Sequence, residues 1–191
     1  MALKTELQMF VLIMDAFLSS TYPKLVCFMT IQIKYSKDID GDDFLRQVLA
    51  IDAVVYPKEL QGTFKSVSER YHRNKNSFIL AFDNDLIVGY ICLFPISKRL
   101  LNEMETTNKF FDDNIDPKDV LPYSESNDIF VISVAILPEY QNGLAIMKLC
   151  KAFKKFVEEK NAMTYAYAVS EKGEKLSKIL GIKLLDSYRY F

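Results

Sequence analysis

The sequence predicts an α/β (α+β) domain in which a mixed, mostly antiparallel central sheet of about six to seven strands is flanked by helices. Three observations lead to this fold class: a hairpin of two neighbouring apolar strands, a strand–turn–helix run from Ile129 to Lys160, and an alternation of strands and helices that continues to Tyr190. The length of 191 residues suits one domain with a sizeable core and is short for two.

Residues 1 to 28 stand apart from this domain. Met9 to Leu18 is an apolar run with the length of a signal-peptide core, but Asp15 within it and the lack of a small-x-small cleavage pattern favour a docking helix over secretion or membrane anchoring. We therefore expect an N-terminal appendage over 1–28 and a single domain over 29–191. A partner subunit is one surface on which the appendage could pack, so a homodimer is left open.

Composition narrows the class of protein. With 24 basic and 25 acidic side chains the formal net charge is −1, which favours neither nucleic acid nor an anionic membrane as a partner. Cys27, Cys92 and Cys150 lie far apart on apolar segments, without the close spacing of metal or redox motifs. We expect reduced core thiols, no metal site and a cytoplasmic protein.

The first elements follow from periodicity. Thr30 to Tyr35 alternates apolar and polar residues and predicts a short edge strand. Apolar residues from Phe44 to Ala53 recur at three- and four-residue spacing behind the acidic run 40–43, which predicts a helix that ends before Pro57. A second helix is predicted over Phe64 to Arg73.

The clearest hairpin joins Ser77–Phe82 to Leu86–Phe94 through the turn Asp83–Asp85. The connection that follows, Ser97 to Asp128, has eight acidic and four basic residues. A connection of this length is typically a lid or a binding loop, or else disordered. Two interpretations stay open, a lid whose carboxylates attract a cation and a solvated loop.

The run from Ile129 to Lys160 predicts a buried strand, a tight turn and an amphipathic helix that packs on the sheet. With Asn142 as N-cap, the amides of Gly143, Leu144 and Ala145 would be unpaired donors, a geometry that suits phosphate, although small residues also occur at turns for steric reasons. A strand over Met163–Val169, a helix over Glu171–Leu180 that Gly181 stops, and a last strand complete the domain.

Two motifs resemble the GNAT-type N-acetyltransferases. Ala135 to Ala145 is similar to the family's strand end, its hydrophobic-x-Pro step and its loop of Arg or Gln, two residues, Gly, one residue, Gly or Ala. Gln141 lies one residue closer to Gly143 than the pattern expects, so either the loop is one residue short or Tyr140 fills the first position. Ala168 to Leu185 resembles the next strand, an Asn-type position held by Ser170, a helix, and a Leu-Gly-Phe step held by Leu180 to Ile182.

The resemblance implies a GNAT-like sheet with a splayed pair of parallel strands and acetyl-CoA, or another acyl-CoA, as co-substrate. Backbone of Val134, Ala135 and Ile136 would pair with the pantetheine arm, with Ser170 beside it. The pyrophosphate would lie on the loop amides, with no Arg or Lys in the loop to pair with it. The implied loop residues are Gln141, Asn142, Gly143, Leu144, Ala145 and Ile146.

The catalytic positions depart from the family pattern. The place where the family often has a tyrosine acid is held by Ser177, with Tyr167 or Tyr165 as substitutes, although strand tyrosines mostly pack in cores. The place of a strand glutamate falls at Ile132, which leaves Asp128 or Glu125 as base candidates, or solvated surface carboxylates.

The resemblance implies an N-acyltransferase that passes acetyl from acetyl-CoA to a primary amine of a small molecule or peptide by direct attack. The alternative is a catalytically silent CoA-binding or interaction module of the same fold, which the missing Tyr and Glu favour. Histidine is the residue type that most often serves as a base, but His72, the single histidine, lies in a polar run that predicts an exposed helix end.

Overall fold

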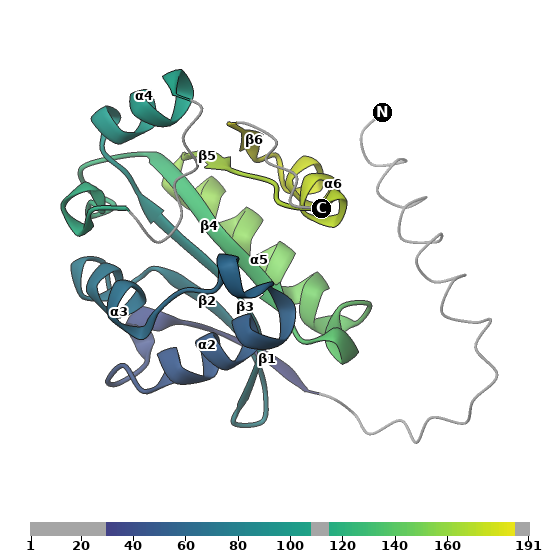
Figure 1. Ribbon diagram of the computed structural model, residues 1–191. Helices are drawn as coiled ribbons and strands as arrows, with labels where there is room; N and C mark the ends of the chain where they lie inside the picture. Colours follow the sequence, from purple (N-terminus) through teal and green to yellow (C-terminus); the bar gives the residue numbers. More distant parts are fainter. Residues whose placement is uncertain (1–29, 108–114, 186–191) are drawn as a thin grey trace.

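The computed structural model describes residues 30–107 and 115–185, and these form one six-stranded sheet (Figure 1). Neighbouring strands from β1 to β4 are antiparallel, whereas β4–β5 and β5–β6 are parallel. The predicted fold class is confirmed. In chain order and in the order of the sheet, the strands are β1 (Ile31–Tyr35), β2 (Phe78–Asp83), β3 (Leu86–Pro95), β4 (Asp128–Ile136), β5 (Met163–Ala166) and β6 (Lys183–Leu184).

Helices cover both faces of the sheet (Figure 1). One face carries α2 (Phe44–Val55), α3 (Phe64–Arg73) and α4 (Lys98–Thr106), and the other carries α5 (Leu144–Lys160) and α6 (Glu171–Leu180). Successive residues of β2 and β3 join opposite cores, because side chains alternate across a strand. Strands buried on both faces explain why the hairpin reads as two continuous apolar runs. Short 3₁₀ segments cover Ser36–Asp38, Lys58–Leu60, Pro117–Asp119 and Pro138–Tyr140.

Local capping sets the helix boundaries. The Thr63 side chain accepts a hydrogen bond from the Ser66 amide at 3.2 Å at the start of α3, and Gly181 ends α6 in the left-handed conformation at φ 73°. The bounds predicted for α3 and α6 are confirmed. α2 continues two residues past Ala53 and ends at Val55, because a residue before proline disfavours the helical conformation.

Gly89 lets β3 and β4 approach closely near the end of β4. A Cβ at this position would lie 2.9 Å from Ile136 Cγ1 and 3.1 Å from the Ala135 carbonyl oxygen. Any larger residue would therefore push on β4. Glycine at position 89 therefore allows the last residues of β4 to lie close against β3.

The connection from Ser97 to Asp128 contains a helix that the sequence analysis missed. The Ser97 side chain caps α4 by accepting a hydrogen bond from the Leu100 amide at 3.1 Å. Three residues of the helix are buried against the sheet: Leu100, Leu101 and Met104. Further on, Val120 forms an isolated bridge with Ile96. The apolar residues of α4 are few and stand among polar ones, so the amphipathic pattern is weak in the sequence. The described part of this connection is therefore not a loop throughout, as was expected, but begins with a helix.

Several expectations fall on residues outside the described ranges: the appendage 1–28, Cys27, and the last strand beyond residue 185. Cys92 is buried and Cys150 is half-buried. His72 lies at the exposed end of α3 as expected, with its side chain 54% exposed. No helix within residues 30–107 and 115–185 has the length and apolar character needed to cross a membrane.

Candidate functional site

A cleft opens where β4 and β5 stop pairing. The first residues of β4, Asp128 to Phe130, pair with Met163 to Tyr165 of β5. β4 continues to Ile136, so its second half has β3 on one side and an open edge on the other. The predicted splayed pair of parallel strands is therefore present.

A β-bulge at Ile132 marks the same point. Cys92 on β3 pairs with Ser133 and Leu93 pairs with Val131, so Ile132 is an extra residue in β4. The bulge interrupts the alternation of side chains, and both Ile132 and Ser133 face the side of the sheet that carries α2. Strand periodicity could not single out Ser133 for this reason.

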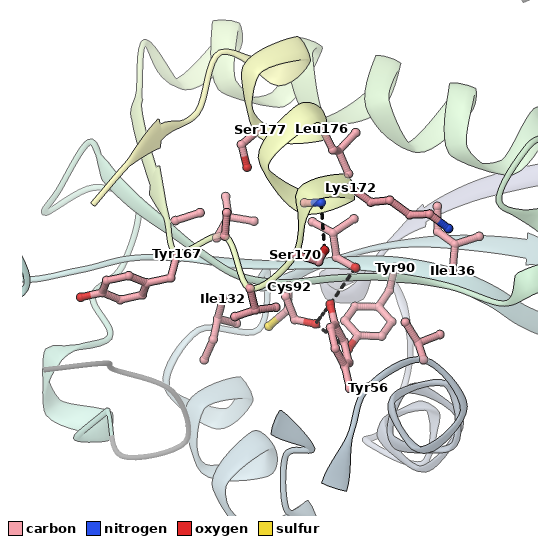
Figure 2. Close-up of a pocket in the computed structure, with 18 of the residues that line it drawn as sticks. Tyr56, Tyr90, Cys92, Ile132, Ile136, Tyr167, Ser170, Lys172, Leu176 and Ser177 are labelled. Carbon is pink, nitrogen blue, oxygen red and sulfur yellow. Dashed lines mark hydrogen bonds between the residues drawn. The ribbon is translucent and has the colours of Figure 1, made fainter. Parts of the chain in front are cut away.

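A cavity of about 810 Å³ lies along the open edge of β4 (Figure 2). Side chains from α2 and α3, from β3 and β4, and from α6 line it. Eight of the sequence-predicted site residues are among them: Val134, Ile136, Gln141, Asn142, Ile146, Ser170, Ser177 and Tyr167. The lining does not include Ala135, Gly143, Leu144, Ala145 or Asp128.

The backbone of β4 presents two residues to the open edge. The Tyr56 hydroxyl donates to the Val134 carbonyl at 2.8 Å, and Gln141 Nε2 donates to the Ile136 carbonyl at 3.1 Å. The Leu137 amide donates in the opposite direction, to Val88 on β3, at 2.9 Å. Because both backbone groups of a strand residue point the same way, Val134 and Ile136 face the cleft and Ala135 faces β3.

The turn after β4 differs from the predicted turn by one residue. Gly143 is the N-cap of α5 and no side chain caps this helix, so the assignment of Asn142 as N-cap is wrong. The Gly143 amide donates to the Tyr140 carbonyl at 3.3 Å. The first-turn donors are therefore the amides of Leu144, Ala145 and Ile146.

Packing within the protein does not require glycine at position 143. A Cβ there would meet only the Tyr140 carbonyl oxygen at 3.7 Å, an ordinary van der Waals contact, and the backbone has φ −129°. The missing side chain leaves open space beside the N-terminus of α5, where backbone amides and the helix dipole favour an anion.

The opposite wall of the cavity comes from the start of α6. Ser170 caps α6 by accepting from the Gly173 amide at 3.1 Å, and Ser177 is buried, with 7% of its surface exposed. Lys172 and Lys175 also line the cavity, and Figure 2 shows the Lys172 side chain extending from α6 toward Ile136 on β4. In the sequence, the family pattern directs attention to the loop before α5, and nothing in it singles out these two lysines.

The other predicted catalytic residues lie in different places. The Tyr167 ring lines the cavity and packs edge-on against Phe130, with ring centroids 5.8 Å apart. Asp128 lies outside the cavity at the start of β4, where it accepts from the Tyr165 hydroxyl at 3.3 Å. The fold thus brings Ser177 and Tyr167 to one cavity and leaves Asp128 at a distance along the strand.

A chain of hydrogen-bonding side chains, which we call the hydroxyl network, forms one wall of the cavity and was missed by the sequence analysis. Its members are Asp52 of α2, Tyr56 just after α2, Tyr90 of β3 and Ser133 of β4. The Tyr90 hydroxyl donates to the Asp52 carboxylate and lies 2.9 Å from Ser133 Oγ, which in turn lies 3.2 Å from the Tyr56 hydroxyl. Figure 2 shows the Tyr56 and Tyr90 rings together beneath β4.

The hydroxyl network is largely shielded from water. Asp52 is 6% exposed and Tyr90 is 1% exposed. Burial, and then the charge of Asp52, hold the pKa of Tyr90 well above its usual value, so this hydroxyl stays protonated at neutral pH. One signal in the sequence could have indicated the site: Asp52 is a carboxylate on the otherwise apolar buried face of α2.

Comparisons with known proteins give likeness at the level of structure. No family model matches the sequence, and no curated protein matches it. Naa50 from Arabidopsis thaliana, solved with the bisubstrate analogue CoA-Ac-MVNAL, is 16% identical over 79% of this chain and 82% of that one, with a TM-score of 0.51.

Two further solved structures have TM-scores just below 0.5. A GNAT family acetyltransferase from Streptococcus pneumoniae is 20% identical over 84% of this chain and 93% of that one, with a TM-score of 0.48. The loading GNATL domain of CurA from Lyngbya majuscula is 18% identical over 65% of this chain, with a TM-score of 0.49, and this chain spans only 59% of it.

The sheet order, the bulged β4 and the splayed strands define an α/β protein with a cleft at the divergence of two parallel strands. The fold is that of the GNAT-type N-acetyltransferases, as the likeness to Naa50 shows.

Proposed function

We propose that this protein is an acyl-CoA-dependent N-acyltransferase that transfers acetyl from acetyl-CoA to a primary amine of a small molecule or peptide. One observation carries the proposal: the open backbone edge of Val134 and Ile136, the loop residues Gln141 and Asn142, and Ile146 in the uncapped first turn of α5 line a single cavity. An extended pantetheine arm needs such an edge, and a pyrophosphate needs such a helix end.

The residues present fit acetyl-CoA. The amides of Val134 and Ile136 would bind the arm, and those of Leu144 to Ile146 would bind the pyrophosphate beside the open space at Gly143. Lys172 and Lys175, on the facing helix, would add charge pairing that the loop lacks. Acetyl-CoA supplies an activated acyl group, and the chain contributes chiefly by positioning it.

The groups proposed for the acceptor side lie in or beyond the same cavity. The amine must attack in its neutral form, because an ammonium has no lone pair. The amide of Ile132, the extra residue of the bulge, is our candidate donor to the oxygen that gains charge during attack. Ser177 and Tyr167 are our candidates for protonating the leaving sulfur, and Asp128 remains a more distant candidate.

A catalytically silent CoA-binding module remains the second candidate, because a serine hydroxyl is a weak acid and Ser177 is buried in α6. Binding and turnover separate the two. We expect acetyl-CoA and CoA to stabilise the protein against thermal unfolding, by about 2.7 kcal/mol at ~100 times the dissociation constant. S-acetyl-N-acetylcysteamine, which has the thioester but no pyrophosphate, is the matched control and should give no comparable shift.

Turnover is followed as thiol release in the presence of an amine panel. The panel should contain a peptide that begins MVNAL, the sequence in the Naa50 ligand, together with spermidine and glutamate. Thiol release that depends on one amine supports the enzyme. Stabilisation by acetyl-CoA without thiol release in the presence of any amine would favour the silent module. No stabilisation at millimolar acetyl-CoA would overturn both the enzyme and the silent CoA-binding module.

A further inference from the structure

The turn that joins β4 to α5 is tied to the hairpin of β2 and β3 by two hydrogen bonds. We call this turn, residues 137–143, the connecting turn, because it runs from the open edge of β4 to the N-terminus of α5. The Leu137 amide donates to the Val88 carbonyl of β3 at 2.9 Å. The Tyr140 hydroxyl donates to Oδ2 of Asp83, the last residue of β2, at 2.9 Å. The hairpin therefore holds the connecting turn at its start and at its middle.

Hydrogen-bond donors of the connecting turn are engaged within the protein. Besides that of Leu137, three of its backbone amides donate to carbonyls of the turn itself, at 2.9 to 3.4 Å: those of Tyr140, Gln141 and Gly143. The Gln141 side chain donates to the Ile136 carbonyl at 3.1 Å. These hydrogen bonds fix the shape of the turn, so we expect a pyrophosphate to be bound by the first amides of α5, from Leu144 onward.

Tyr140 supports the connecting turn from outside the cavity. Its ring is half-buried and packs against the core on the α5 face of the sheet. Burial, and then the hydrogen bond to Asp83, raise the pKa of its hydroxyl, so the hydroxyl is protonated and can donate at neutral pH. Asp83 is held on its other side, where Oδ1 accepts from Asn84 Nδ2 at 3.3 Å. The described residues that line the cavity include Gln141 and Asn142 but not Tyr140, so any effect of Tyr140 on a ligand is indirect.

We propose that Tyr140 is a positioning residue for the acyl donor, because its hydrogen bond to Asp83 fixes the spacing between the open edge of β4 and the first amides of α5. This inference rests on the proposed acyltransferase function. The edge would bind the pantetheine arm and the helix end the pyrophosphate of the same molecule, so the two surfaces must stand at the spacing of one ligand. A connecting turn that is already ordered lowers the entropic cost of binding both groups.

This role predicts a loss of affinity that depends on the pyrophosphate. S-acetylpantetheine has the thioester and the arm of acetyl-CoA but no pyrophosphate, so it needs the edge of β4 and not the helix end. Loss of the Tyr140 hydroxyl should therefore weaken the binding of acetyl-CoA and spare that of S-acetylpantetheine. A residue that serves only the stability of the fold would affect both ligands alike or neither.

The test is Tyr140→Phe, which keeps the packed ring and removes only the hydroxyl. Isothermal titration should show about tenfold lower affinity for acetyl-CoA than in the wild type. The affinity for S-acetylpantetheine, measured by competition with acetyl-CoA, should stay within about twofold of the wild-type value. Wild-type affinity for acetyl-CoA in this variant, or an equal loss for both ligands, would overturn the positioning role.

Substitutions of Asp83 test the same hydrogen bond from its acceptor. Asp83→Asn keeps an oxygen that can accept from the Tyr140 hydroxyl, whereas Asp83→Ala does not. The two variants carry the same charge, so a difference between them reports the hydrogen bond and not the charge near the pyrophosphate. We expect Asp83→Ala to bind acetyl-CoA about tenfold more weakly than Asp83→Asn. Equal affinities in the two variants would contradict the proposal.

Tyr123→Phe is the matched control. The Tyr123 hydroxyl also donates within the protein, to the carbonyls of Asn76 and Leu93 at 3.1 and 3.3 Å, but it lies outside the connecting turn. Its removal should lower the temperature of thermal unfolding and leave the affinity for acetyl-CoA within about twofold. A tenfold loss of affinity here as well would mean that affinity follows stability, against the proposal. Failure of the wild-type protein to bind acetyl-CoA would overturn the proposed function, whereas a failed Tyr140 test alone leaves that function intact.

Discussion

The two sides of the cavity are built in different ways. The donor side, which we call the backbone wall, consists of the open edge at Val134 and Ile136 and the first amides of α5, all within one short stretch of chain. The hydroxyl network consists of four side chains whose contacts span 38 to 77 positions of sequence. Local backbone geometry forms the backbone wall, whereas tertiary packing brings together the hydroxyl network.

This difference predicts how each side responds to substitution. The backbone wall uses groups that every residue carries, so only a side chain that blocks the open space or a change that shifts the backbone can damage it. The hydroxyl network uses specific oxygens in a buried setting, where removal of one partner leaves another unsatisfied. Variants of the backbone wall should lose ligand affinity with little change in stability. Variants of the hydroxyl network should lose stability with little change in ligand affinity.

The largest effect is expected from Gly143→Glu. The new side chain would place bulk and negative charge at the N-terminus of α5, and we expect acetyl-CoA affinity to fall at least about 100-fold, or ~2.7 kcal/mol. The fold should tolerate it, because a Cβ here meets only the Tyr140 carbonyl at 3.7 Å. Isothermal titration measures the affinity and chemical denaturation the stability.

Gly143→Ala is the matched control for that variant, because it adds the Cβ without the charge. It should retain affinity within about tenfold. Wild-type affinity in Gly143→Glu would mean that the anion does not lie at this helix end.

Asp52→Ala should have the opposite profile. Loss of the carboxylate leaves the buried Tyr90 hydroxyl without its acceptor, and we expect a loss of about 2–3 kcal/mol in the free energy of unfolding. The dissociation constant for acetyl-CoA should change less than about threefold. Glu59→Ala, an exposed acidic residue after α2, is the control and should cost less than about 0.5 kcal/mol. An Asp52→Ala protein that is as stable as the wild type but has lost affinity for acetyl-CoA would contradict the expected difference between the hydroxyl network and the backbone wall.

The same difference decides what the sequence could reveal. The strand, turn and helix around Gly143 form a contiguous pattern, so the fold class, α6 and the cleft were predictable. Asn142 was misassigned as the cap because side-chain capping preference cannot distinguish a turn shifted by one residue. Ser133 escaped because the bulge at Ile132 breaks the strand period. Tyr56 and Tyr90 escaped because only the fold brings Tyr56 to Ser133 and Tyr90 to Asp52.

Alkaline pH tests the buried end of the hydroxyl network. The pKa of Tyr90 is raised in the folded state, first by burial and then by Asp52. A raised folded pKa gives stability that is complete below the unfolded pKa of about 10 and declines above it, by about 1.4 kcal/mol at pH 11 for one such group. Urea denaturation between pH 8 and 11 should therefore show a smaller decline in Tyr90→Phe than in the wild type. Parallel curves would show that the Tyr90 hydroxyl titrates as it does in the unfolded chain.

The smallest effect lies at Ser170, which caps α6 and lines the cavity opposite the backbone wall. Ser170→Ala removes the cap and should cost about 1 kcal/mol of stability, whereas Ser170→Asp preserves the cap. If Ser170 also lies beside the donor, the added charge of Ser170→Asp should weaken acetyl-CoA binding severalfold although the protein is as stable as the wild type. Equal affinity in Ser170→Asp and the wild type would restrict Ser170 to capping. The pair thus separates, at one residue, the stability that the cap provides from any effect of this position on donor binding.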